Sequence, residues 1–137
     1  MAETTVHSTT TPRLTAGGIL HAVLRIGAGL LFMQHGAQKL FGMFGGNQVE
    51  LISQMGLAGI LEFFGGLLIV LGLFTRPVAI ILVIEMLWAY FQQHMPQGGA
   101  PIENGGELAL LFALTFAFFA AHGPGPASVD RKMGWRI

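Results

Sequence analysis

Residues 55–94 read MGLAGILEFFGGLLIVLGLFTRPVAIILVIEMLWAYFQQH, and the predicted fold follows from the apolar residues of this segment. It contains two apolar runs separated only by Thr75, Arg76 and Pro77. A helix needs about 20 apolar residues to cross a bilayer at about 1.5 Å of rise per residue, and the length of each run approaches this number. Two such runs in direct succession predict two transmembrane helices joined by a short turn.

The composition of the whole chain is typical of an integral membrane protein. Of its 137 residues, 53% are hydrophobic and 10% are charged. An ordinary soluble domain contains about 25% charged residues. The net charge is zero, so the charge balance gives no indication of nucleic-acid binding. The absence of cysteine excludes disulfides, thiolate metal sites and covalent c-type haem within this chain.

Two further apolar runs complete a predicted all-α fold, an integral membrane, antiparallel four-helix bundle. Thr11 and Pro12 predict the start of the first helix, because a hydroxyl caps free N–H groups and proline fits the first turn. Thr75 and Asn104 are the predicted caps of the third and fourth helices. The transmembrane domain covers 12–123, with spans at about 14–34, 56–75, 77–94 and 105–122.

The charges outside the spans predict the orientation. Residues 1–11 are polar and are expected to form a disordered tail, and residues 124–137 form a short basic tail. With four spans, both termini and the turn at Arg76 lie on one side of the membrane. The opposite side carries Lys39 as its only lysine or arginine. The positive-inside rule therefore places both termini in the cytoplasm. The cations on the predicted cytoplasmic side are Arg13, Arg76, Arg131, Lys132 and Arg136.

Ionisable residues within the apolar runs are the best indication of a functional site. Counting about 1.5 Å per residue from the inner ends places Arg25 and Glu85 near the middle of the bilayer. Glu62 and Glu107 then share a level nearer the outer face. An ionised side chain at this depth costs about 2.5–3.5 kcal/mol, so these residues should face inward and pair. One cation among three acids predicts that at least one acid is protonated.

The predicted site is a polar pocket that opens toward the outer leaflet or the outer face. His35, Lys39 and His94 lie near the outer interface and would form its mouth. Several of these residues also have a purely structural interpretation: Arg25 paired with Glu62 or Glu85 would fix helix register. The residues of the candidate pocket are Arg25, His35, Lys39, Glu62, Glu85, His94 and Glu107.

Metal and haem sites are weaker alternatives. His35, His94, Glu62 and Glu107 are ligand types that suit zinc or iron. No HxxxH or ExxH spacing occurs in the chain, so we expect no metal site. A haem held by two histidines, His35 and His94, is a further alternative.

The chain resembles the DoxX family of small four-helix bacterial membrane proteins over about residues 20–131. No single matching segment is specific, but their order and spacing together support the resemblance. The segments are Arg25 with Gly29, His35-Gly36 with Lys39, Glu62 with Gly65-Gly66, Gly72 with Thr75-Arg76-Pro77, Asn104 to Glu107, and Gly123-Pro124-Gly125 with Ser128 to Asp130.

The resemblance implies a bacterial inner-membrane protein that takes part in quinone-linked redox work. It implies a quinone as a possible ligand, with Arg25, His35, Lys39, Glu62 and Glu107 matching the recurrent polar residues of the family. On this interpretation the chain is the membrane subunit of an oxidoreductase and not a complete enzyme by itself. Its expected partners are membrane lipid, a protein that carries the redox chemistry, and further copies of itself.

Two other functions remain open from the sequence. One is a non-enzymatic membrane anchor or assembly subunit for a peripheral enzyme, in which the buried charges specify packing or docking. The other is a transporter for protons or small molecules, which is less favoured because no span is clearly broken at the middle of the bilayer. A ligand-sized cavity around Glu62 would favour the quinone-binding interpretation over the anchor.

Overall fold

The structure, a computed structural model, describes residues 14–137, and this part of the chain consists of helices and connecting loops without a strand. The first helix, α1 (Ala16–Phe41), begins where the Thr15 hydroxyl accepts a hydrogen bond from the backbone N–H of Gly18. It ends at Gly42, whose positive φ of 65° suits glycine. The predicted helix start at Thr11 and Pro12 and the predicted disordered tail lie outside the described residues.

The second and third apolar runs form two long helical segments, each interrupted by a π-helical turn. The second run consists of α2 (Gln54–Ile60), the π-helical η1 (Leu61–Gly65) and α3 (Gly66–Leu71). The third consists of α4 (Thr75–Ala89), the π-helical η2 (Tyr90–His94) and the 3₁₀ turn η3 (Met95–Gln97). The remaining helices are the short α5 (Pro101–Asn104), the apolar α6 (Glu107–His122) and the short α7 (Val129–Lys132).

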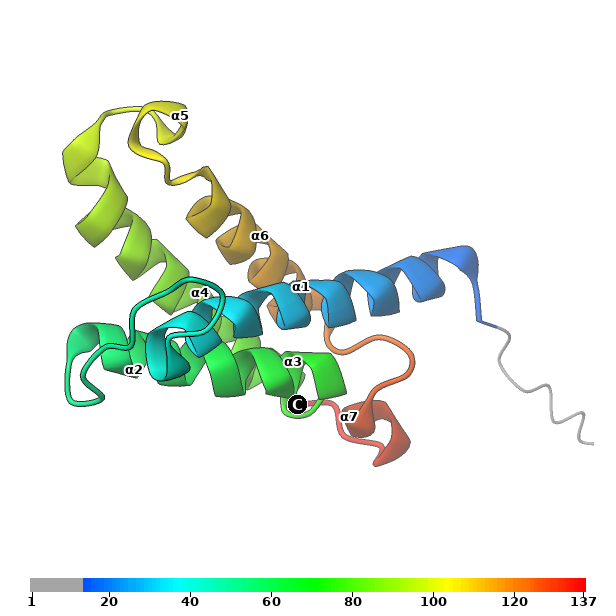
Figure 1. Cartoon of the computed structure of the whole chain (residues 1–137). Coiled ribbons are helices and arrows are strands. Elements are labelled where there is room, and N and C mark those ends of the chain that lie inside the picture. Colours follow the sequence, from blue (N-terminus) through cyan, green and yellow to red (C-terminus); the bar gives the residue numbers. More distant parts are fainter. Residues whose placement is uncertain (1–13) are drawn as a thin grey trace, which may run out of the picture.

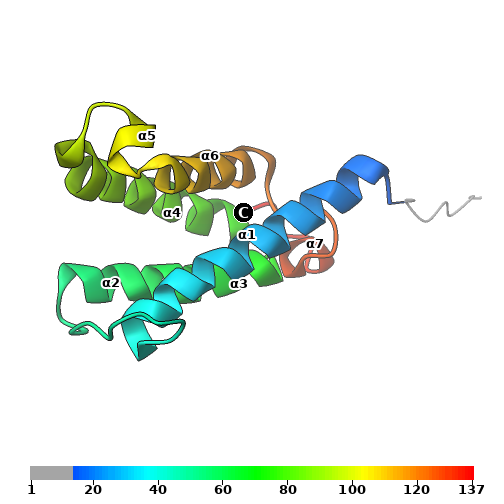
Figure 2. The same cartoon turned by 45° about the horizontal axis from the view of Figure 1, so that its top comes forward.

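The long helices form two layers (Figures 1 and 2). In one layer α1 packs along α2, η1 and α3, and in the other α4 packs along α6. The layers meet near the α3–α4 turn and lie apart at the end that carries α2 and α5 (Figure 2). Between them lies a core that includes Phe32, Ile69, Leu82, Phe116 and Phe119, each at most 1% exposed.

Glycines allow the backbones within the first layer to touch. A Cβ atom added to Gly36 would lie 2.7 Å from the carbonyl oxygen of Gly59. Gly29 and Gly66 face each other in the same way, since a Cβ on either residue would lie 2.8 Å from the other's carbonyl oxygen. Close approach at small residues is how helices associate in membranes, where lipid removes the hydrophobic driving force between them.

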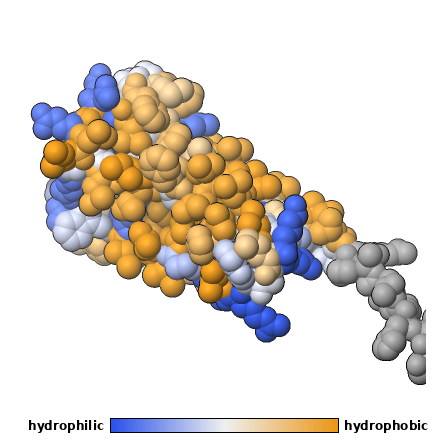
Figure 3. Space-filling view, turned by 90° about the horizontal axis from the view of Figure 1, so that it is seen from below, coloured by the Kyte–Doolittle hydropathy of each residue, from blue (hydrophilic) through white to orange (hydrophobic). Residues whose placement is uncertain are grey.

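The outer surface of the layers is apolar. Side chains on α1, α4 and α6 expose large hydrophobic groups, for example Leu20 at 67%, Ile84 at 63% and Leu114 at 69%. On the face drawn in Figure 3, apolar residues form a broad continuous surface, and hydrophilic residues gather toward its margins. A soluble protein rarely exposes so large an apolar patch. By length and composition, three helical segments can cross a membrane, 16–41, 54–71 and 75–97, and α6 is a shorter apolar helix.

The caps of α4 and α6 differ from those that the sequence predicts. Thr75 is the first residue of α4 and not its cap, and the carboxylate of Asp130 accepts hydrogen bonds from the N–H groups of Phe74 (2.8 Å) and Thr75 (2.9 Å). Phe74 precedes α4 and adopts a left-handed backbone conformation, with φ 50°. The cap of α4 therefore comes from a residue distant in sequence.

Asn104 stabilises the loop before α6 without capping that helix. It is the last residue of α5, and Gly106 precedes the first residue of α6. The side-chain oxygen of Asn104 accepts a hydrogen bond from the N–H of Gly106 at 2.8 Å, and its amide donates to the carbonyl of Gly98 at 2.9 Å. Glu107 is the first residue of α6 and is exposed, and no side-chain hydrogen bond caps this helix.

Candidate functional site

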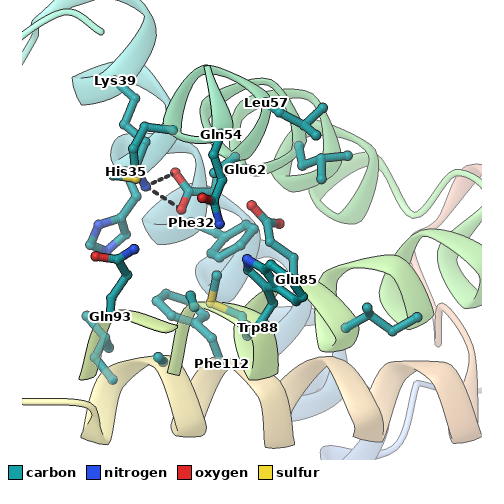
Figure 4. A pocket seen from close by; sticks show the side chains of 18 of the residues that line it. Phe32, His35, Lys39, Gln54, Leu57, Glu62, Glu85, Trp88, Gln93 and Phe112 are labelled. Carbon is teal, nitrogen blue, oxygen red and sulfur yellow. Dashed lines mark hydrogen bonds and ion pairs between the residues drawn. The ribbon is translucent and has the colours of Figure 1, made fainter. Parts of the chain in front are cut away.

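A cavity of about 760 Å³ lies between the two layers toward the end where they separate. Figure 4 shows side chains from both layers converging on it. Most of its wall is apolar, with a small number of polar groups. The residues that line the cavity include Phe32, His35, Lys39, Gln54, Glu62, Glu85, Trp88, Gln93, His94 and Phe112.

An ion pair between α1 and η1 forms one side of the cavity. The ammonium of Lys39 lies 2.5 Å from each carboxylate oxygen of Glu62. Glu62 is 4% exposed, so this carboxylate depends on Lys39 for compensation. Both residues were predicted to lie in a pocket, but their pairing with each other was not predicted.

Glu85 enters the same cavity from α4. Figure 4 shows its carboxyl group turned toward the space that the carboxylate of Glu62 also faces. Both carboxyl oxygens of Glu85 are buried, and within the described residues neither has a hydrogen-bond partner. A buried polar atom without a hydrogen-bond partner costs free energy. The carboxyl group of Glu85 is therefore able to accept a hydrogen bond from a ligand in the cavity.

Two histidines also line the cavity. The ring of His35 meets Phe112 edge-on, with ring centroids 5.9 Å apart. His94 has a backbone partner, because its Nδ1 lies 3.1 Å from the carbonyl oxygen of Asn104. Among the described residues, no group of three or more histidine, aspartate and glutamate side chains is arranged to hold a metal ion.

Both π-helical turns contribute residues to this cavity. Glu62 belongs to η1, and Gln93 and His94 belong to η2. A π turn adds a residue to the helical repeat and so rotates the side chains that follow it, and such turns occur frequently at functional sites. These turns were not predicted from the sequence. Trp88 lies three residues after Glu85, which puts both on one helix face.

Arg25 lies away from the cavity and binds the C-terminal segment. Its guanidinium is completely buried and donates hydrogen bonds to the carbonyl groups of Ile69 (2.8 Å), Val70 (2.5 Å), Pro126 (3.3 Å) and Ala127 (2.8 Å). The first two carbonyls belong to the end of α3, and the other two belong to the loop before α7. Arg25 therefore joins these segments.

Two predicted pocket residues are consequently outside the cavity. Arg25 does not meet Glu85, and exposed Glu107 does not line the cavity wall. Estimates of depth along each helix placed both residues at a suitable level but could not specify the direction in which each side chain points. The structure does bring together His35, Lys39, Glu62, Glu85 and His94.

These features define a small all-helical membrane protein in which a largely apolar cavity carries a few ionisable groups. The chain belongs to the DoxX family, because the family model of that name matches residues 20–95, more than half of its length. This finding confirms the resemblance that the sequence motifs indicated.

One relative and the solved structures complete the comparison. An uncharacterised protein of Haemophilus influenzae is 42% identical to this chain over 118 residues, which cover 81% of this chain and 88% of the relative. No solved structure matches the chain.

Proposed function

We propose that the protein is the membrane subunit of a quinone-linked redox system and that its cavity binds a quinone or another small lipophile. The observation that carries this proposal is a cavity with apolar walls and ionisable groups between helices suited to a membrane. Its volume of about 760 Å³ falls within the range of small-molecule sites, about 300–1,000 Å³. A lipophile can enter such a site from the bilayer.

The polar groups suit a ligand with one polar head and an apolar body. His35, Lys39 and Glu85 supply hydrogen-bonding groups, and Phe32, Trp88 and Phe112 supply aromatic wall. A quinone head group presents oxygen atoms on a flat ring, and its apolar substituent would extend along the apolar lining. We propose that this chain provides the binding site and that a protein partner provides electron transfer.

We further propose that the protein resides in the bacterial inner membrane as an antiparallel four-helix bundle with both termini in the cytoplasm. The distribution of cations supports this orientation. Arg76 lies in the first turn of α4, and Arg131, Lys132 and Arg136 belong to the C-terminal segment, whereas Lys39 lies in the last turn of α1. This asymmetry fits the positive-inside rule.

Trp88 provides a direct test of ligand binding, because the chain has only one other tryptophan, Trp135. The Trp135→Phe variant retains Trp88 in the cavity wall as the sole indole. We expect a short-chain ubiquinone to quench its fluorescence in detergent with a saturable dependence on concentration.

The matched control is Trp88→Phe, which retains only Trp135, an indole stacked on Phe74 with ring centroids 5.4 Å apart. This variant reports collisional quenching by quinone dissolved in the same micelle. Equal, non-saturating quenching in both variants would contradict the proposed binding site.

Native mass spectrometry of the gently extracted protein tests the assembly. A bound quinone supports the proposal, and a protein partner without any small molecule favours an anchor.

A further inference from the structure

The inference concerns the hydrogen-bonding needs of Glu85 and rests on the proposed function of the cavity. Among the described residues that line the cavity, Glu85 alone has buried side-chain oxygen atoms without a hydrogen-bond partner. The other lining acid, Glu62, has both oxygens bound by Lys39. Within the described part of the chain, Lys39 is the only lysine or arginine that lines the cavity, and a different carboxylate already engages it.

We infer that Glu85 makes the site select a ligand that brings a hydroxyl donor, so that a hydroquinone or phenol binds in preference to a head group bearing only acceptors. An ionised carboxylate has two acceptor oxygens and no donor. A protonated carboxyl has one O–H donor and keeps a carbonyl acceptor; a ligand hydroxyl can bind both, whereas a quinone carbonyl can bind only the O–H and leaves the acceptor unpaired. In either state, Glu85 requires a donor that the described residues do not supply. An oxidised quinone without hydroxyl groups offers carbonyl acceptors only, whereas its reduced form offers two O–H donors.

The surroundings of Glu85 fit an aromatic head group of this kind. Trp88 lies three residues further along α4, and Phe32 and Phe112 line the cavity from α1 and α6 (Figure 4). These aromatic surfaces can cover a flat ring while Glu85 receives its hydroxyl hydrogen. The ionisable groups that line the cavity from the other layer are His35, Lys39 and Glu62, and none of them donates a hydrogen bond to Glu85. Lys39 binds Glu62 instead. A ligand that carries a hydroxyl group can supply the missing donor.

Three compounds of one framework test this inference: tert-butylhydroquinone, its monomethyl ether and its dimethyl ether. They carry two, one and no O–H donors on the same ring. Affinity for the full-length protein is measured by equilibrium dialysis between matched detergent solutions, so that partition into micelles cancels. We expect the dimethyl ether to bind at least about 10-fold more weakly than the hydroquinone, about 1.4 kcal/mol.

The variants assign this preference to one side chain. In Glu85→Leu, which removes the acceptor, we expect the preference for the hydroquinone to fall to about 2-fold. Glu85→Gln retains one acceptor oxygen and should have an intermediate preference; it also serves if the leucine variant does not fold. Glu103→Gln is the matched control, because Glu103 is exposed in α5 and outside the cavity. It should keep the full preference.

The outcomes separate the inference from the proposed function. Saturable quenching of Trp88 by ubiquinone, with equal affinity for tert-butylhydroquinone and its two ethers, would overturn the inference and leave the quinone site intact. A hydroquinone preference that persists in Glu85→Leu would also overturn it. If neither ubiquinone nor any of the three compounds binds the wild-type protein, the proposed function itself fails.

Discussion

Replacing Arg25 with methionine distinguishes a structural role from a ligand-binding role for this residue. Methionine fills a similar length of the buried space but cannot donate hydrogen bonds. The change removes the donors to the carbonyls of Ile69, Val70, Pro126 and Ala127 and leaves polar groups buried. We therefore expect the C-terminal segment to detach from the end of α3.

The expected magnitude follows from the burial of these groups. Arg25 is 0% exposed and donates to four backbone carbonyls. Leaving a buried polar group without its partner costs about 1–3 kcal/mol, so losing this set of hydrogen bonds should cost about 3–5 kcal/mol of unfolding free energy. For a chain of this size, such a loss lowers the melting temperature by about 10 °C or more.

The assay is thermal unfolding in detergent, followed by circular dichroism and by the fluorescence of Trp135 in a Trp88→Phe background. Trp135 stacks on Phe74, so its emission reports release of the C-terminal segment. Arg76→Met is the matched control: Arg76 is half-buried and donates to two carbonyls, those of Ala120 and Ala121. We expect it to lose much less stability than Arg25→Met.

The melting temperature and the ubiquinone affinity of Arg25→Met together decide between the two roles. If Arg25→Met melts like Arg76→Met and binds ubiquinone much more weakly, then Arg25 belongs to the ligand site, as its predicted depth suggested. If it is destabilised while the folded fraction binds ubiquinone normally, the structural assignment is supported.

Three further substitutions test the packing and the ion pair. Gly36→Ala should destabilise the fold by about 1–3 kcal/mol, because the new Cβ would meet the Gly59 carbonyl, and a lowered melting temperature would reveal this. Asp130→Asn should cost about 1–3 kcal/mol, since an amide can offer only one acceptor to the two N–H groups at the start of α4; unchanged thermal stability would contradict that role. Lys39→Met should cost about 3–5 kcal/mol by leaving Glu62 unpaired, and adding Glu62→Leu should recover most of the loss in a double-mutant melting cycle.

Much of the helical content can be predicted from the sequence, because long apolar runs have few alternatives in a bilayer. The same reasoning selected Glu62 and Glu85, since ionisable residues within apolar runs are costly and must face inward. Lys39 was placed at the mouth of the pocket because it lies near the predicted outer interface. It did not assign their partners. A depth along the helix follows from counting residues, but the direction of a side chain also depends on local helical geometry. Each π turn changes that direction.

The role of Asp130 was also beyond local sequence reasoning. It caps α4 through contacts with Phe74 and Thr75, more than 50 residues earlier in the chain. A capping motif is recognised by a fixed short spacing, and no such spacing exists here. Arg25 shows the same limitation, because its partners Pro126 and Ala127 lie about 100 residues away.

The two ends of the molecule differ, because the two layers are held together at one end and enclose a cavity toward the other. At one end, Arg25 and Asp130 hold the C-terminal segment against the turn between α3 and α4, where the two layers meet. Toward the other end the layers diverge, and the π turns η1 and η2 bring polar side chains to the space between them. A site formed between two layers is altered if one layer shifts, so loss of the Arg25 and Asp130 contacts should reduce ligand affinity only as far as it loosens the layers. Substitution of Glu85 leaves these contacts intact and should instead change ligand preference without a matching loss of stability. This difference separates the two roles experimentally.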